Sequence, residues 1–158
     1  AFNGNTTAFI EMEDGINEFG LAEGLTFIYP TIIKPGFNAG MLVRYLLEKC
    51  KTVDECIYTL NKIPIASQET LTIADKNGNI AVIECNCNHV EVIYPNDDGN
   101  FVTIANEFTS DKMKVYNNYN EEIFYLVNMD LCVNMIENLM PILYGLLFIM
   151  SKTMKYTE

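Results

Sequence analysis

Apolar residues cluster in two short β-prone runs near the start of the chain, residues 7–12 and residues 21–29. This pattern predicts two β-strands. Residues 14–17 lie between the runs and contain a glycine and an asparagine, which tolerate positive backbone φ angles. We therefore expect a hairpin that turns at residues 14–17. Pro30 and the Lys34-Pro35-Gly36 turn should end this part of the sheet.

Two helices are expected next. Asn38 is a suitable N-cap for a helix over residues 41–49, where apolar residues recur at helical spacing. Thr52 and Glu55 have the spacing of a capping box, which predicts the start of a second helix. Pro64 lies beyond the expected end of that helix.

The following residues are rich in strand signals. Residues 69–74 and 80–84 flank an Asn-Gly pair, a strong short-range indicator of a β-hairpin. Residues 90–94 and 101–105 predict two further strands. The order of strands and helices predicts an α+β layered domain over residues 1–120.

Composition narrows the class of protein. The chain has 158 residues, of which 49% are hydrophobic, enough for one domain with a core. Its formal charge of −11 argues against nucleic acid as a partner, because phosphate binding needs clustered Lys and Arg. Five cysteines without disulfide-type spacing indicate free thiols in a reducing compartment, so we expect a cytoplasmic protein. With His89 as the only histidine, we predict no metal site and no cofactor.

A resemblance to a known group rests on two segments. DGINEFGLAEGLTF at residues 14–27 contains an N-E-x-G-L pattern, and FVTIANEF follows at residues 101–108. Both resemble segments of the choloylglycine hydrolase-like linear amide hydrolases, which include the acyl-coenzyme A:6-aminopenicillanic acid acyltransferase family. The resemblance covers most of residues 4–118. It implies an incomplete αββα sandwich of the N-terminal nucleophile hydrolase type, a cysteine nucleophile exposed by self-cleavage, and a small-molecule amide or acyl substrate.

The resemblance also implies roles for individual residues. Asn106 matches the asparagine whose side-chain amide donates to the oxyanion, although an asparagine that simply ends a strand gives the same pattern. The backbone N–H of Thr26 matches a second donor, at a position where many family members have asparagine. Phe27 and Tyr29 are candidates to line an acyl pocket, although strand aromatics are usually core residues. Glu107 replaces the histidine or asparagine often found there, which suggests different substrate contacts.

The nucleophile itself is missing from its expected place. Residue 1 is alanine, and no cysteine precedes Cys50. Cys50 and Cys56 lie at helical positions suited to core packing. Cys85 and Cys87 alternate along a predicted strand and would share a face, but an internal cysteine cannot supply the α-amine that acts as base. We therefore expect the chain by itself to be inactive, as a fragment of an enzyme or, alternatively, as a non-catalytic binding or degenerate domain.

Residues 121–158 have a different character. They contain an apolar run at residues 139–150, which is shorter than the roughly 20 residues of a membrane span, so we expect no membrane association. When residues 125–158 are back-translated and read two nucleotides out of phase, the peptide resembles the C-terminal strands of the family. We hypothesise that this tail is a frameshift product. Open sheet edges in such a fragment would favour association into a homo-oligomer.

Overall fold

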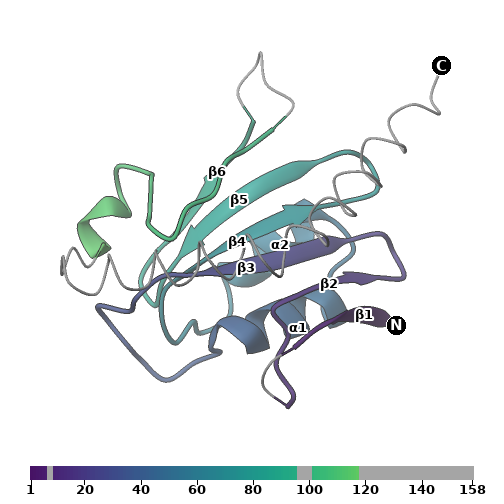
Figure 1. The fold of residues 1–158 in the computed structure, drawn as a ribbon, viewed down its shortest axis with the longest axis horizontal. Helices are drawn as coiled ribbons and strands as arrows, with labels where there is room; N and C mark the ends of the chain where they lie inside the picture. Colours follow the sequence, from purple (N-terminus) through teal and green to yellow (C-terminus); the bar gives the residue numbers. More distant parts are fainter. Residues whose placement is uncertain (7–8, 96–100, 118–158) are drawn as a thin grey trace, which may run out of the picture. The chain divides into compact units, whose positions relative to one another are not determined.

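The computed structural model describes residues 1–6, 9–95 and 101–117, which belong to one compact unit. Their main feature is a six-stranded antiparallel sheet in which the strands follow one another in sequence order (Figure 1). Two helices are inserted between the third and the fourth strand. The elements are β1 (Phe2–Asn5), β2 (Asp14–Asn17), β3 (Ala22–Phe27), α1 (Ala39–Lys49), α2 (Val53–Leu60), β4 (Glu69–Ala74), β5 (Ile80–Cys85), β6 (Val90–Ile93) and the short 3₁₀ helix η1 (Lys114–Tyr116).

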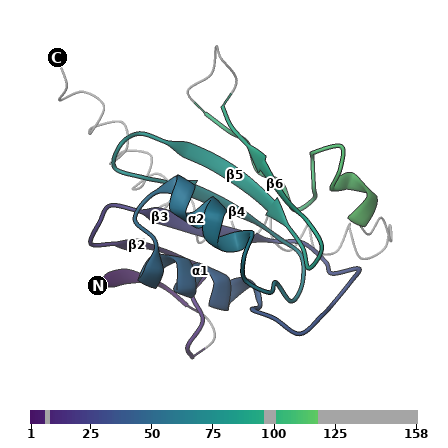
Figure 2. The ribbon, with the colours of Figure 1, turned by 180° about the vertical axis from the view of Figure 1, so that it is seen from behind.

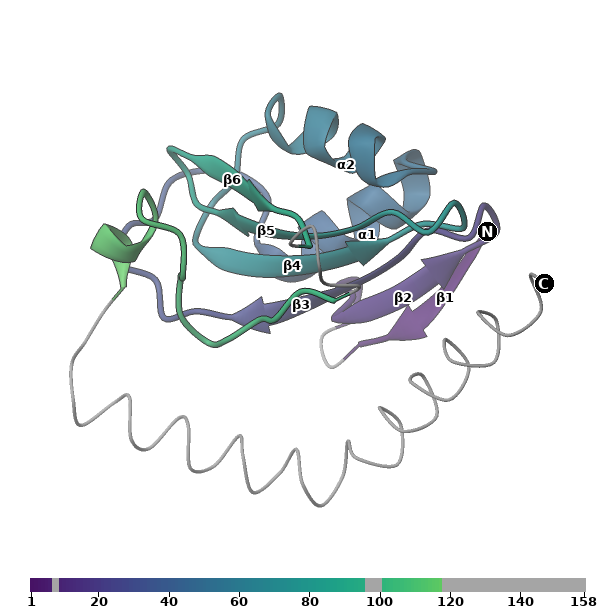
Figure 3. The ribbon, with the colours of Figure 1, turned by 90° about the horizontal axis from the view of Figure 1, so that it is seen from above.

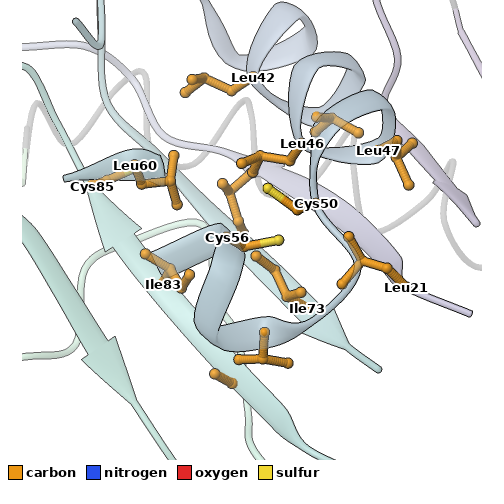
Figure 4. Close-up of a cluster of buried hydrophobic side chains, with 14 of the residues drawn as sticks. Leu21, Leu42, Leu46, Leu47, Cys50, Cys56, Leu60, Ile73, Ile83 and Cys85 are labelled. Atoms are coloured by element: carbon orange, nitrogen blue, oxygen red, sulfur yellow. The ribbon is translucent and has the colours of Figure 1, made fainter. Parts of the chain in front are cut away.

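Both helices cover the same face of the sheet (Figure 2). Side chains alternate between the two faces of a strand, so Ile73 of β4 and Ile83 of β5 point to the helical side. There they pack against Leu42 and Leu46 of α1, and all four side chains are fully buried (Figure 4). This layering of helices on an antiparallel sheet confirms the predicted α+β class.

The predicted helices are present, and their caps explain where they begin. The side chain of Asn38 accepts a hydrogen bond from the N–H of Met41 at 2.9 Å. Thr52 accepts from the N–H of Glu55 at 3.3 Å. Glu55 does not complete the expected capping box, because its carboxylate accepts from the N–H of Lys51 instead, at 2.7 Å.

The first predicted hairpin was placed wrongly. Residues 14–17 form strand β2, paired on one side with β1 and on the other with β3. The turn follows them and uses Gly20, whose φ is +82°. Asn17 forms this turn from the end of the strand, because its buried side chain accepts from the N–H groups of Phe19 and Leu21. Residues 9–12 of the predicted first strand are irregular, and residues 7–8 lie outside the described part.

The second half agrees better with the prediction. Strands β4, β5 and β6 are present, and Gly78 of the Asn-Gly pair has the expected positive φ, +85°. Residues 101–105, in contrast, form no strand. Figure 3 shows that the segment 101–117 runs along the side of the sheet that the helices leave open. The tail at residues 121–158 lies outside the described residues.

Candidate functional site

A row of polar side chains crosses the open face of the sheet. Thr26 of β3 lies opposite Thr70 of β4, and Thr70 lies opposite Glu84 of β5. Their neighbours Leu25 and Ile83 pack in the helical core, so the three polar residues point the other way. Thr70 is 1% exposed, and its hydroxyl has no hydrogen-bond partner in the described part. The face opposite the helices therefore carries buried polar side chains, Thr70 and Glu84, whereas a sheet face open to water would expose them.

Asn106 contacts the backbone next to Thr26. Its side-chain Nδ2 donates to the backbone carbonyl of Phe27 at 3.0 Å. The structure thus brings together the two segments that the sequence singled out, which are far apart along the chain. A primary amide carries two N–H donors, and the contact with Phe27 occupies one of them. The other has no partner among the residues that the structure describes.

Thr26 lies directly before Phe27, but its N–H has a defined direction within the sheet. The N–H of Leu25 donates to Glu13 at 2.9 Å, on the β2 side. Because N–H groups alternate in direction along a strand, the N–H of Thr26 points toward β4, where Thr70 lies opposite. The role of this group as a second oxyanion donor stays a prediction.

The three predicted substrate-binding residues lie next to the residues already described: Phe27 ends β3, Tyr29 lies two residues beyond it, and Glu107 follows Asn106. Phe27 and Tyr29 are about half exposed, at 47% and 46%, and Glu107 is partly buried. Alternation along β3 directs the Phe27 side chain away from the face that carries Thr26. Whether these residues line an acyl pocket stays a prediction.

No described cysteine lies on this face. Cys50, Cys56 and Cys85 are buried in the helical core, as expected for the first two. A hydrogen bond with Cys56 lowers the pKa of Cys50 to about 7, whereas burial raises that of Cys85. Cys87 follows the end of β5, so the expectation that it shares a strand face with Cys85 was wrong. The single His89 is exposed and stacks near Tyr116, with ring centroids 5.8 Å apart.

Two buried polar residues that the sequence did not identify link separate segments of the chain at this site. The carboxylate of Glu84, which is 1% exposed, accepts hydrogen bonds from Thr109 and Ser110. Gln68, 2% exposed, donates through Nε2 to the carbonyls of Tyr29 at 3.0 Å and Tyr116 at 2.9 Å. The available signal was an acidic residue inside the otherwise apolar run of β5. The sequence alone could not identify its partners.

Within residues 1–6, 9–95 and 101–117, no group of three or more His, Cys, Asp or Glu side chains is arranged to hold a metal ion. Among the helices of the described part, none has the length and apolar character needed to cross a membrane.

Comparison with known proteins identifies a family and a set of similar solved structures, two of which are named below. The profile of the family "acyl-coenzyme A:6-aminopenicillanic acid acyl-transferase" matches residues 1–123. Penicillin V acylase from Agrobacterium tumefaciens is 24% identical with a TM-score of 0.46, over 58% of this chain and 30% of that one. A variant of conjugated bile acid hydrolase from Clostridium perfringens is 20% identical with a TM-score of 0.52, over 62% of this chain and 36% of that one.

The second of these similarities shows a shared fold. The chain spans about a third of the length of the two solved structures. No curated protein sequence matches it.

Proposed function

Because the chain belongs to the acyl-coenzyme A:6-aminopenicillanic acid acyltransferase family, we propose that it supplies the oxyanion-binding part of an enzyme that cleaves linear amides. The observation that carries this proposal is the side-chain amide of Asn106, held beside the end of β3 by its bond to Phe27. An amide donor is suited to this task, since it has no charge to titrate and is fixed before the reaction begins.

The proposed reaction proceeds through a thioester. A cysteine thiolate attacks the carbonyl carbon of the substrate amide, and the carbonyl π electrons move to the oxygen. Asn106 donates to this oxyanion. Collapse of the tetrahedral intermediate re-forms the carbonyl and breaks the C–N bond, and the α-amine of the nucleophile, having taken the thiol proton, returns it to the leaving nitrogen. Water or a second amine then attacks the thioester and releases the thiol.

The nucleophile would come from outside the described residues. Cys50, Cys56 and Cys85 lie in the helical core, and Cys87 follows the end of β5 without an α-amine of its own. None of these internal cysteines carries an α-amine, and the same holds for Cys132, so we expect the 158-residue chain to show no amide hydrolysis. Penicillin V and a conjugated bile acid are the first substrates to test, because the neighbouring solved structures are named for activity on them.

The test begins with the gene. We expect a cysteine codon upstream of the codon for Ala1, and hydrolysis of an acyl amide by the protein from that longer frame. Asn106→Ala in the longer protein should lower kcat by roughly 10²–10³-fold with little change in KM, as expected when one oxyanion donor is removed. Asn61→Ala, on the exposed end of α2, is the matched control and should leave kcat unchanged.

Two results would contradict this proposal. Amide hydrolysis by the 158-residue chain, lost in Asn106→Ala, would mean that the nucleophile lies within the chain. An upstream frame without a cysteine would favour a non-catalytic binding domain that keeps the fold. In that case Asn106 would have only its structural bond to Phe27.

A further inference from the structure

We infer that Glu84 is a positioning residue, which fixes the segment carrying Asn106 to the open face of the sheet and so sets the direction of the Asn106 amide. The function of that amide rests on the proposed function, but the fixing of the segment does not. Glu84 lies on β5 and is separated in sequence from Asn106, so the connection appears only in the folded structure.

Both oxygens of the Glu84 carboxylate accept hydrogen bonds, and all the donors belong to two successive residues. Oε1 accepts from the N–H of Thr109 at 2.5 Å and from its hydroxyl at 2.8 Å. Oε2 accepts from the N–H of Ser110 at 3.1 Å and from its hydroxyl at 2.6 Å. A buried carboxylate is tolerated only when its oxygens are hydrogen-bonded, and bonds to a charged acceptor are stronger than neutral ones. Thr109 and Ser110 therefore cannot move without leaving a buried charge unpaired.

The segment that follows Asn106 is also closed on itself. The side chain of Asn117 accepts from the N–H of Phe108 at 2.8 Å and donates to its carbonyl at 2.9 Å. Phe108 is 1% exposed and packs with Ile28 and Met113. Residues 108–117 thus form a closed loop whose small core includes Ile28 from the chain after β3, and Glu84 attaches that loop to β5.

Asn106 lies two residues before this loop. Its own bond to Phe27 is a single hydrogen bond between neutral groups, which would be weak in a free segment. The loop held by Glu84 limits the positions that Asn106 can take, so the amide meets the end of β3 in one orientation. This is the preorganisation that an oxyanion donor needs.

The sheet offers a matched control. Glu91 of β6 lies directly opposite Glu84 and also contacts this loop, through an ion pair with Lys112 at 2.6 Å. The Lys112 side chain in that pair is 74% exposed, and surface ion pairs of this kind contribute little to stability. Removing the charge of Glu91 should therefore leave Asn106 in place, whereas removing that of Glu84 should not.

The experiment uses side-chain amide signals in the ¹⁵N NMR spectrum of the full 158-residue chain. The Asn106→Asp variant has no side-chain NH₂ group at this position, so the pair of signals missing from its spectrum belongs to Asn106. In the parent protein we expect its two protons to be well separated in shift, because one is hydrogen-bonded to Phe27. In Glu84→Gln the pair should move to the shifts of a free amide, and hydrogen exchange of the Thr109 and Ser110 N–H groups should rise at least tenfold. Glu91→Gln should change neither.

A second variant guards against misfolding. Ser110→Ala removes one hydroxyl donor and keeps Glu84, so it should fold and give an intermediate shift of the Asn106 pair. Unchanged Asn106 signals in Glu84→Gln, with faster exchange at Thr109 and Ser110, would overturn the positioning role. So would an Asn106 pair that is already free in the parent protein.

The longer protein separates this inference from the proposed function. If it hydrolyses amides, Glu84→Gln should lower kcat with little change in KM, and an unaltered kcat would refute the inference alone. Absence of activity in the longer protein would refute the proposed function and leave the NMR result to decide the role of Glu84.

Discussion

Glu69 should make the stability of this protein fall as the pH rises from 5 to 8. Glu69 opens β4 on the helical side of the sheet and is 0% exposed. Burial raises its pKa from 4.5 to about 8, although hydrogen bonds from Cys85 and Ser67 oppose this change. The thiol of Cys85 lies 3.7 Å from Oε1. The folded protein therefore holds Glu69 in its protonated form at neutral pH.

The sign and size of the effect follow from these two pKa values. A carboxyl group with a raised pKa binds its proton more tightly in the folded state, so its stabilising effect is complete below pH 4.5 and is lost as pH rises through 8. Each pH unit between the two values costs about 1.4 kcal/mol. Between pH 5 and pH 7 the loss should be about 2.5 kcal/mol, a large part of the typical stability of a domain.

Glu69→Gln tests this directly, since glutamine resembles the protonated carboxyl group in shape and cannot ionise. Urea unfolding followed by far-UV circular dichroism at pH 5, 6 and 7 gives the free energy of unfolding. The difference between Glu69→Gln and the parent should grow by about 2.5 kcal/mol over this range. Glu23, whose pKa burial also raises, is present in both proteins and cancels.

Glu48→Gln is the control, because Glu48 lies on the solvent side of α1 and should keep the parent dependence on pH. Parallel pH profiles for Glu69→Gln and the parent would refute the reasoning. They would mean that Glu69 ionises in the folded protein as readily as in the unfolded chain.

Three further substitutions test the turns. Asn17→Ala should lower the free energy of unfolding by about 3 kcal/mol. The reason is that Asn17 donates to the carbonyls of Leu47 and Cys50 and accepts from two turn N–H groups. A loss below about 0.5 kcal/mol in urea unfolding would mean that water replaces these bonds. Gly78→Ala should cost about 1 kcal/mol from its positive φ alone. Gly20→Ala should cost more in the same assay, since its new Cβ would lie 2.9 Å from that of Lys76, and equal losses would show that Lys76 moves aside.

The parts of the fold that could be predicted from sequence are those fixed by neighbouring residues. Asn38 and Thr52 cap helices through bonds to residues three positions on, and both helices were predicted correctly. The first hairpin was misplaced because Asn17 forms its turn from the end of a strand and is held by the carbonyls of Leu47 in α1 and Cys50 just after it, which no local pattern reveals. Residues 101–105 have strand-like composition, yet they do not pair with β6, the last strand of the sheet.

The candidate site shows the same division. Asn106 was singled out through the resemblance to a family; the structure shows its hydrogen bond to Phe27, and its role as an oxyanion donor stays a prediction. Glu84 and Gln68 were missed because each acts on residues distant in sequence, Glu84 on Thr109 and Ser110, and Gln68 on Tyr29 and Tyr116. A buried polar residue in an apolar strand is visible in the sequence, but its partner is decided by tertiary structure.

The order of the strands also has a consequence for the rate of folding. Because every strand of the sheet pairs with its neighbour in sequence, most strand pairings close short loops, which favours rapid folding. The exception is the pairing of β3 with β4, in which Phe27 lies opposite Glu69 with both helices in the intervening loop. Among the strand pairings, this one closes the longest loop and so has the largest entropic cost. Lengthening it should slow folding, whereas changes in the hairpin turns should alter stability more than speed.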